Sequence, residues 1–377
     1  MMGISGLRVL AVMAKEVKQL TRDRLTFAIM LLIPIMQLTL FGYAINFQPR
    51  RLPTAVLVEE DSRFARSIVA ALRNSSYFAF TRQARTPAEL DELVRRGEAQ
   101  FAVTIPGDFT RRVARGDHAQ VLVEADASDP SANSAAVAAL AALPEQALAH
   151  DLTGALAPRS PAQPPFEVVI HNRFNPEAVT AFNIVPGLLG VILSITMVMM
   201  TALSVTREIE RGTMESLLAT PVQPIEVMAG KLAPYVLVGM IQTAVILVTA
   251  RLLFHVPMQG GWTGLTLGTA LFIVGSLALG FLISTVATSQ LQAMQLSLFY
   301  MLPSILLSGF AFPFRGMPGW AQAIGEVIPV THFLRLVRGA LLKGQVLGDQ
   351  WPELSALLAF VCIVTALAML RYRRTLD

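Results

Sequence analysis

Charged residues are scarce in this chain: they make up 15% of its 377 residues, whereas 54% are hydrophobic. Ordinary soluble domains carry about 25% charged residues and a smaller fraction of apolar residues than this chain does. A chain with so little charge is typical of a protein embedded in a membrane, and a wholly soluble globular protein is excluded as the simplest interpretation.

Cysteine and the common catalytic motifs are also nearly absent. The single Cys362 cannot form an intramolecular disulfide. No HExxH, G-x-S-x-G or CxxC pattern occurs, and the five histidines are scattered. Gly230 and Lys231 lack the earlier glycine and the following Ser or Thr of a phosphate-binding loop. We therefore expect a chain that is not an enzyme and has no catalytic, cofactor or metal site of its own.

Long apolar segments, in contrast, are plentiful. A hydrocarbon core about 30 Å thick needs roughly 20 residues of helix. Six segments meet this length, at residues 25–46, 182–205, 232–254, 265–288, 291–312 and 354–372. Lys and Arg gather before the first, after the second and after the last, and such cations favour the cytoplasmic side. The sequence predicts an α-helical polytopic protein with six transmembrane helices and both termini in the cytoplasm.

The first 24 residues show apolar positions at helical spacing among several Lys and Arg. This pattern predicts an amphipathic helix over 1–24 that lies on the inner membrane surface and contacts membrane lipids. The alternative is an ordinary helix packed on the cytoplasmic loops of the chain.

Residues 47–180, between the first two spans, have the composition of a soluble domain. Short runs rich in branched and aromatic residues predict strands over 54–61, 77–83, 101–106, 120–126 and 166–172. Helical patterns over 62–75, 86–99 and 131–152 separate them. This alternation predicts an inserted extracytoplasmic α/β domain with a mixed sheet, and its near-neutral charge argues against nucleic acid as a partner. Asp126 and Asp129 are expected to serve a turn.

The charged segment 206–231 interrupts the apolar spans. Gly212 breaks the preceding helix, Thr213 is a good N-cap with Glu215 behind it, and Pro221 ends the new element. The apolar residues of this short helix share one face: Met214, Leu217 and Leu218. A helix of this kind suits a groove on another protein. A membrane-surface helix and a plain connecting loop are the alternatives.

The order of residues around this segment resembles the cytoplasmic signature of ABC-2 type export permeases. The matching residues are Arg207, Glu208, Glu210, Gly212, Thr213, Glu215, Leu217, Leu218, Thr220, Pro221, Glu226, Gly230 and Lys231. The approach to the second span also matches, at Asn175, Pro176, Phe182, Val185, Pro186 and Gly187. Ile209 departs from the pattern, because such permeases often carry a basic residue there.

The resemblance implies a permease subunit of an ATP-driven exporter in the bacterial cytoplasmic (inner) membrane. ATP and magnesium would be bound by a separate ABC ATPase, and two permease chains would pair, as a homodimer or with a homologue. A periplasmic adaptor is a further candidate partner. Residues 206–230 would hold the coupling helix, and residues 313–350 would form an outer re-entrant segment. The residues expected to meet the ATPase are Arg207, Glu208, Glu210, Arg211, Gly212, Thr213, Met214, Glu215, Leu217, Leu218, Thr220 and Pro221.

Two other functions compete with export. A receptor or sensor would bind a ligand with the outer α/β domain, but it would not need six spans. A membrane-embedded hydrolase would need polar catalytic groups within the spans, where the sequence offers only scattered Ser, Thr and Gln.

Small and polar residues recur at helical spacing on two of the predicted spans. Such residues let helices approach closely or line a polar cavity. They predict a translocation or dimer face, with packing inside one chain as the alternative. The residues are Gly187, Gly190, Ser194, Met197 and Thr201 on the second span, and Ser297, Met301, Ser304 and Ser308 on the fifth.

Overall fold

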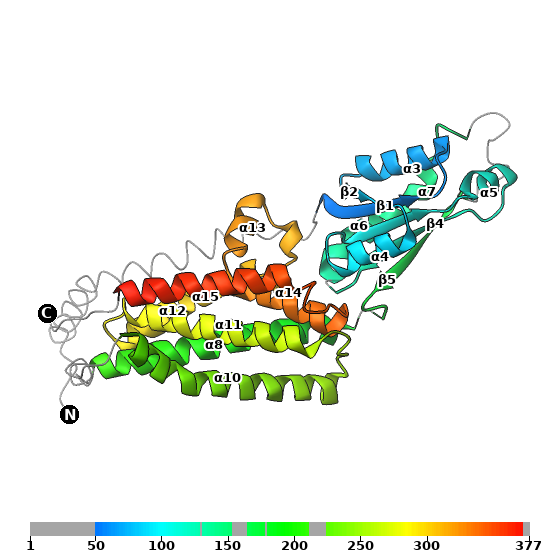
Figure 1. Ribbon diagram of the computed structural model, residues 1–377. Helices are drawn as coiled ribbons and strands as arrows, with labels where there is room; N and C mark the ends of the chain where they lie inside the picture. The colour runs from blue at the N-terminus through cyan, green and yellow to red at the C-terminus, as the bar shows by residue number, and fades with distance from the viewer. Residues whose placement is uncertain (1–49, 129, 153–163, 178, 211–223, 372–377) are drawn as a thin grey trace, which may run out of the picture.

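The computed structural model describes residues 50–128, 130–152, 164–177, 179–210 and 224–371. Within them the chain forms an α/β domain at one end of a bundle of long helices (Figure 1). The predicted helix over 1–24 and the predicted first span over 25–46 lie outside the described residues.

The α/β domain is built on a five-stranded mixed sheet. Its order is β2-β1-β3-β4-β5, with β1 parallel to β2 and β3, β3 antiparallel to β4, and β4 parallel to β5. The strands are β1 Leu52–Val58, β2 Phe78–Gln83, β3 Phe101–Ile105, β4 Gln120–Asp126 and β5 Glu167–Arg173. All five strands predicted from the sequence are therefore confirmed, and so is the mixed sheet.

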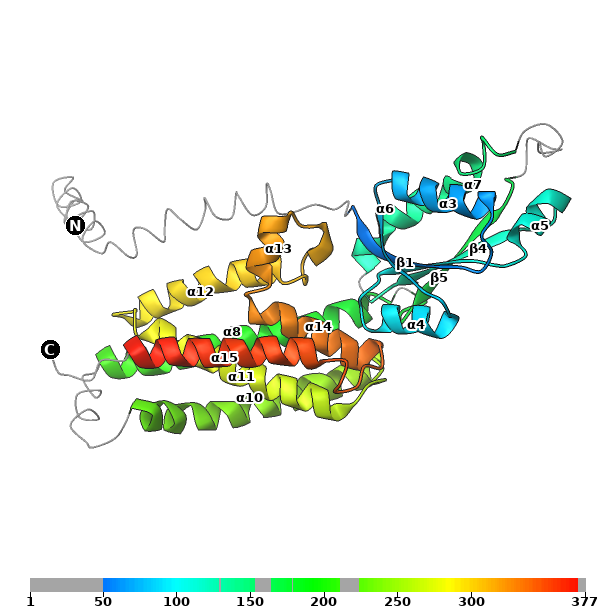
Figure 2. The same ribbon diagram turned by 45° about the horizontal axis from the view of Figure 1, so that its top comes forward.

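Helices cover both faces of this sheet (Figure 2). Alternate residues of a strand point to opposite faces. Phe101 and Val103 of β3 pack in the larger core beneath α3, α5, α6 and α7, while Ala102 packs with Leu90 and Val94 of α4 on the other face. Bulky side chains on one face and alanines on the other thus place α4 close to the sheet.

The helices of this domain begin at ordinary caps. Ser62 accepts a hydrogen bond from the Ala65 amide at the start of α3, and Thr86 accepts one from Glu89 at the start of α4. Their bounds are α3 Arg63–Asn74, α4 Pro87–Arg95, α5 Phe109–Arg115, α6 Pro130–Ala141 and α7 Leu143–Gln146. The sequence missed α5, because seven residues are too few to show a periodic pattern.

Among the described residues, the bundle contains five long helices and a short-helix segment. The long helices are α8 Thr180–Glu210, α10 Pro224–Phe254, α11 Trp262–Ser284, α12 Gln290–Leu307 and α15 Trp351–Arg371. Between α12 and α15 the chain forms η3 Phe314–Gly316, α13 Gly319–Gly325 and α14 Pro329–Leu342. The expectation of short helices rather than one span in the segment 313–350 is confirmed, while its outer, re-entrant location stays a prediction.

Four of the described helices are long and apolar enough to cross a membrane: α8, α10, α11 and α15. The fifth predicted span forms α12, but this helix is shorter than expected and carries Gln290, Gln292 and Gln295 in its first turns. The count of six spans stays a prediction.

α8 and α11 occupy the middle of the bundle, whereas α10 and α15 expose most of their apolar length. α14 packs against α8, α11 and α15, and its Phe333 ring stacks on Phe272 of α11 at 4.1 Å between centroids. Exposed leucines on α10, such as Leu237 and Leu252, are suited to lipid. The bundle therefore has a packed interior and an apolar outer surface.

Gly280 sets the spacing between α8 and α11. A Cβ atom at this position would lie 2.5 Å from the Val198 carbonyl oxygen and 2.9 Å from Thr201 Cβ. Backbone cannot move aside as a flexible side chain can, so α8 and α11 would have to separate.

We predict that Gly280→Ala destabilises the protein by about 1–3 kcal/mol, the usual cost of overpacking a core. The thermal unfolding midpoint in detergent measures this. Gly348→Ala is the matched control, because a Cβ there meets no atom within 4 Å. Equal midpoints for the two variants would show that α8 and α11 are not in close contact.

Candidate coupling, translocation and domain-docking sites

The end of α8 farthest from the α/β domain carries the first residues of the predicted coupling segment. Glu210 accepts hydrogen bonds from the Gln290 backbone amide at 2.7 Å and from Gln290 Nε2 at 2.5 Å. Arg207 Nε donates to Gln290 Oε1 at 3.5 Å. Glu208 lies between Arg207 and Glu210 on α8. These bonds join the end of α8 to the start of α12, so a displacement of one is transmitted to the other.

The other predicted coupling residues lie outside the described residues. They are Arg211, Gly212, Thr213, Met214, Glu215, Leu217, Leu218, Thr220 and Pro221. Their role stays a prediction.

The predicted small-residue face lies inside the bundle of a single chain. A Cβ on Gly187 would meet Phe310, and one on Gly190 would meet Phe333 of α14. Thr201 faces Gly280 of α11. The side chains of this set that are buried are Ser194, Met197, Thr201, Ser297, Ser304 and Ser308, while Met301 is half-buried. The structure thus brings the two predicted stripes into the packing around α8, and their use as a path or dimer contact stays a prediction.

Buried hydroxyl groups on α12 form hydrogen bonds, whereas some on α8 and α11 do not. Ser297 and Ser304 donate to carbonyl oxygens of their own helix, at 2.7 and 2.8 Å. The buried hydroxyls of Thr201 on α8 and Ser276 on α11 have no hydrogen-bond partner among the residues that the structure describes. Native proteins leave few buried polar groups unpaired. The contact between α8 and α11 therefore holds polar groups that this arrangement of the helices does not satisfy.

A second group of polar residues joins the α/β domain to the bundle. Arg95 of α4 donates two hydrogen bonds to the carboxylate of Asp349, at 2.6 and 3.3 Å. Gln345 Nε2 donates to the Arg95 carbonyl oxygen at 2.8 Å. The pKa of Asp349 is held below its ordinary value: burial acts to raise it, but the hydrogen bonds from Arg95 and the Val346 amide, with the positive charges of Arg95 and Arg96, together outweigh burial. This carboxylate is therefore charged at neutral pH.

Asp126 at the end of β4 provides another link. Its Oδ1 accepts a hydrogen bond from the Ser128 amide at 3.0 Å, which confirms the predicted turn. Its other oxygen pairs with Lys343 at the end of α14, a contact that the sequence did not predict. Arg315 adds a hydrogen bond from its guanidinium to the Gly97 carbonyl oxygen at 3.0 Å. Together these bonds hold the α/β domain on the segment between α12 and α15.

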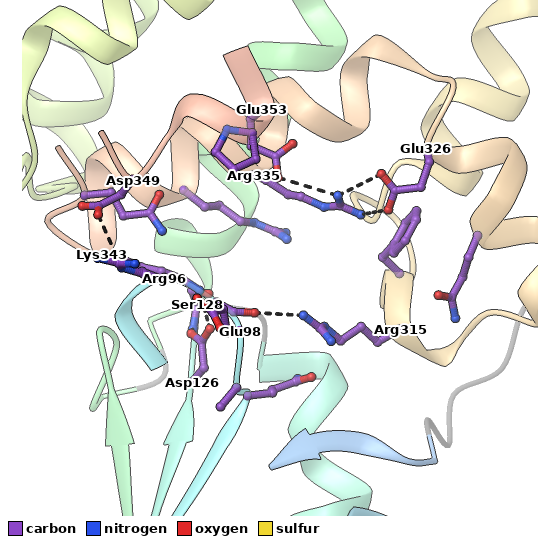
Figure 3. Close-up of a pocket in the computed structure, with 18 residues that line it drawn as sticks. Arg96, Glu98, Asp126, Ser128, Arg315, Glu326, Arg335, Lys343, Asp349 and Glu353 are labelled. Atoms are coloured by element: carbon purple, nitrogen blue, oxygen red, sulfur yellow. Dashed lines mark hydrogen bonds and ion pairs between the residues drawn. The ribbon is translucent and has the colours of Figure 1, made fainter. Parts of the chain in front are cut away.

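A cavity of about 450 Å³ lies between the domain and this segment (Figure 3). Its wall contains both signs of charge. The cations and the acids that line it are equal in number and come from both sides: Arg96, Arg315, Arg335, Arg338 and Lys343, with Glu98, Asp126, Glu326, Asp349 and Glu353. Because the cations and acids are equal in number, the cavity is polar but its lining has no net charge, and most of these side chains form ion pairs with one another.

One wall of the cavity is a network centred on His332 of α14. Its Nδ1 lies 2.5 Å from a Glu353 carboxylate oxygen of α15, and its Nε2 lies 2.8 Å from the Glu326 carbonyl oxygen. Arg335 donates to the Glu326 carboxylate at 2.6 Å, and its guanidinium lies 4.5 Å from the centre of the Phe314 ring. These contacts fasten α13, α14 and α15 together.

The charges in this network shift the pKa values of two groups. For His332, burial acts to lower the pKa, but the hydrogen bonds to Glu353 and to the Glu326 carbonyl raise it above its ordinary value. For Glu326, burial acts to raise the pKa, but the hydrogen bond from Arg335 leaves it lower than usual. The network therefore favours a protonated His332 between two carboxylates.

Chemistry beyond binding is not evident at these sites. No group of three or more His, Cys, Asp or Glu within the described ranges could hold a metal ion. The ion pairs and hydrogen bonds here join helices and domains.

A family model described as ABC-2 family transporter protein matches residues 24–370 of the chain. The chain belongs to the ABC-2 transporter family. The predicted resemblance is thereby confirmed across almost the whole chain, including both the α/β domain and the bundle.

Named relatives of this ABC-2 family chain include permeases of Escherichia coli K12. It is 30% identical over 379 residues to the probable multidrug ABC transporter permease YbhS, with 99% of each chain covered. It is 26% identical to the probable multidrug ABC transporter permease YbhR, covering 97% of this chain and 98% of that one. The inner membrane transport permease YhhJ is 29% identical, with 77% of each chain covered. No solved structure matches this chain.

The His332 network generates a pH prediction for this ABC-2 family chain. Because the pKa of His332 is raised in the folded protein, its stabilisation is fully present below the ordinary value of 6.5. It is lost as the pH rises through the folded-state pKa. We expect His332→Gln to lower the unfolding midpoint at about pH 6 by the equivalent of about 1.5–3 kcal/mol, the contribution of a hydrogen bond to a charged group.

The difference between wild type and His332→Gln should shrink toward about pH 9, where both imidazole and glutamine are neutral. His118→Gln, an exposed histidine of the α/β domain, is the control and should leave the midpoint unchanged at every pH. A His332→Gln effect that stays constant with pH would contradict a protonated His332.

Proposed function

We propose that this chain is the permease subunit of an ATP-driven exporter that moves amphiphilic, drug-like molecules out across the bacterial cytoplasmic membrane. The observation that carries the proposal is the family match over residues 24–370. The printed names of the relatives YbhS and YbhR, probable multidrug permeases, support the substrate class. The missing phosphate-binding loop supports a separate ATPase that binds ATP and magnesium.

The course of α8 supports opposite locations for the domain and the coupling segment. α8 contains 31 residues, which corresponds to a length of about 46 Å at 1.5 Å per residue. It begins beside the α/β domain and ends at the far end of the bundle (Figure 1). A helix of this length crosses a bilayer with residues to spare. The coupling segment after Glu210 then faces the cytoplasm, and the α/β domain lies outside.

Export explains the contacts better than a receptor or a hydrolase does. The bonds of Glu210 join α8 to α12 directly beside the segment that we assign to the ATPase. At the opposite end, Arg95 and Asp349 join the bundle to the outer domain. Closure of the ATPase would displace the end of α8, and the rigid helix would carry that displacement to the cavity beneath the domain.

Leu217 is the residue that we expect to enter an apolar groove on the ATPase, together with Met214 and Leu218. Leu217→Asp would bury an unpaired carboxylate there and weaken association by several kcal/mol, the effective penalty for such an ion. Glu208→Ala should cost no more than about 1 kcal/mol, because exposed ion pairs contribute little.

Copurification of the ATPase and transport-linked ATP hydrolysis are the measurements for these two variants. Both proteins should still reach the membrane, since the changes lie outside the apolar spans. If Leu217→Asp leaves both quantities at wild-type levels while Glu208→Ala abolishes them, the apolar docking mechanism is wrong and a contact between charges replaces it.

In the proposed exporter, two permease chains form a dimer. The small-residue face either forms the contact between them or lines the translocation path. Cysteines at Ser194, Ser297 or Ser304, in a Cys362→Ser background, test whether this face is shared. Crosslinks between chains would assign the face to the dimer, and lost transport without crosslinks would assign it to the path. We expect the second result, because all three side chains are buried inside one chain. Full transport without crosslinks would contradict both roles.

A further inference from the structure

A second cleft lies next to the polar cavity and differs from it in charge. Its volume is about 460 Å³, and it opens between the start of β1 and the η3–α13 segment. Arg50 and Arg51 form one side, and Arg315 with Gln322 forms the other. None of the eight residues that line it is acidic. Three arginines thus line a cleft that has no carboxylate in its wall.

Arg50 and Arg51, which directly precede β1, form no ion pair among the described residues. Both side chains are exposed. Most arginines nearby, such as Arg95 and Arg335, are paired with carboxylates. A ligand that reached the cleft would therefore meet positive charge without displacing a protein anion.

The backbone at Arg51 is held in an unfavourable conformation. Its φ of 58° lies in the left-handed region, which residues other than glycine rarely adopt. The Arg51 amide donates to the Ser76 carbonyl oxygen at 3.0 Å and fixes this geometry. Strained residues of this kind cluster at ligand-binding sites. This conformation of Arg51 lies directly before β1, and both Arg50 and Arg51 line the cleft.

Arg315 contributes the third positive charge from the opposite wall. Its guanidinium donates one hydrogen bond to the Gly97 carbonyl oxygen, which carries no formal charge. Desolvation and the neighbouring charge of Arg335 lower the pKa of Arg315 from its ordinary value. This arginine remains protonated at neutral pH, and an anion in the cleft would relieve the unfavourable environment of its charge.

The tryptophans indicate the depth of the cleft relative to a membrane. The chain contains three tryptophans, and all lie at the end of the bundle next to the α/β domain. Trp262 begins α11, Trp351 begins α15, and Trp320 of α13 lies two residues beyond Pro318 at the cleft. Each is at least 44% exposed. Tryptophan is enriched at the level of lipid headgroups, so the cleft lies at that level.

We propose that this cleft binds a phosphate-bearing anion, such as the headgroup of an anionic phospholipid. Guanidinium groups bind phosphate oxygens in pairs through charge-assisted hydrogen bonds, and three arginines line this cleft. Met317, buried in the wall, and the proline residues beside it provide an apolar part for the glycerol and the first carbons of an acyl chain. The site is independent of the proposed transport function, because it rests on the cleft alone.

The test uses the full chain, purified in an uncharged maltoside detergent that contains no phosphate. Isothermal titration calorimetry with dihexanoyl phosphatidylglycerol, dihexanoyl phosphatidylcholine and inorganic phosphate compares three probes. We expect phosphatidylglycerol to bind at least tenfold more tightly than phosphatidylcholine, with an affinity that falls as salt is added. Phosphate binding as tight as that of phosphatidylglycerol would assign the site to a free phosphate group rather than a lipid.

The double variant Arg50→Gln/Arg51→Gln should weaken phosphatidylglycerol binding at least tenfold. Arg50→Lys/Arg51→Lys keeps the charge but loses the paired donors. Its affinity for phosphatidylglycerol should therefore lie between that of the wild type and that of the double Gln variant. Arg115→Gln removes one exposed charge of α5, at a distance from the cleft, and should bind as wild type does. Unchanged unfolding midpoints check that the variants fold. Equal binding by Arg115→Gln and the double Gln variant, or equal binding of both lipids, would overturn the proposal.

Discussion

Close contact between α8 and α11 is the constraint on which the rest of the bundle depends. Lipid offers no hydrophobic driving force between helices, so association in a membrane rests on tight packing. Gly280 permits this packing by leaving room for the Val198 carbonyl and Thr201. α14 then packs across both helices through the stacked rings of Phe333 and Phe272. The same pair of helices carries the buried hydroxyls of Thr201 and Ser276, which have no hydrogen-bond partner among the described residues.

The attachment of the α/β domain follows a different principle. Charged hydrogen bonds join it to the segment between α12 and α15, through Arg95 with Asp349 and Lys343 with Asp126, and Phe174 packs against the apolar clusters on both sides. Contacts of this kind gain direction from geometry but are weaker per area than a packed core. A domain held in this way can shift as a rigid unit while the core of its sheet stays intact.

The two cavities at this junction perform different tasks because their charges differ. In the first cavity acids balance cations, and the His332 network fastens three helices. The wall of the second cleft contains Arg50, Arg51 and Arg315 but no acidic residue. Both lie where the spans meet the soluble domain, at the level marked by the tryptophans. A cavity with balanced charges and an arginine-lined cleft thus lie side by side at this junction.

The sequence alone determined the class of protein, the strands and most of the helices. Apolar length predicts spans because a bilayer fixes how long they must be, and alternating short runs predict strands because side chains alternate across a sheet. Only the tertiary structure decided which polar residues meet. Arg95 and Asp349 are 254 residues apart, and each looks like an ordinary exposed charge in its own segment. Ser194 and Ser304 show the same limit. Spacing placed each on a face of its own helix, but only the tertiary structure showed that both side chains are buried in the bundle, because periodicity gives the direction of a side chain and not its neighbour.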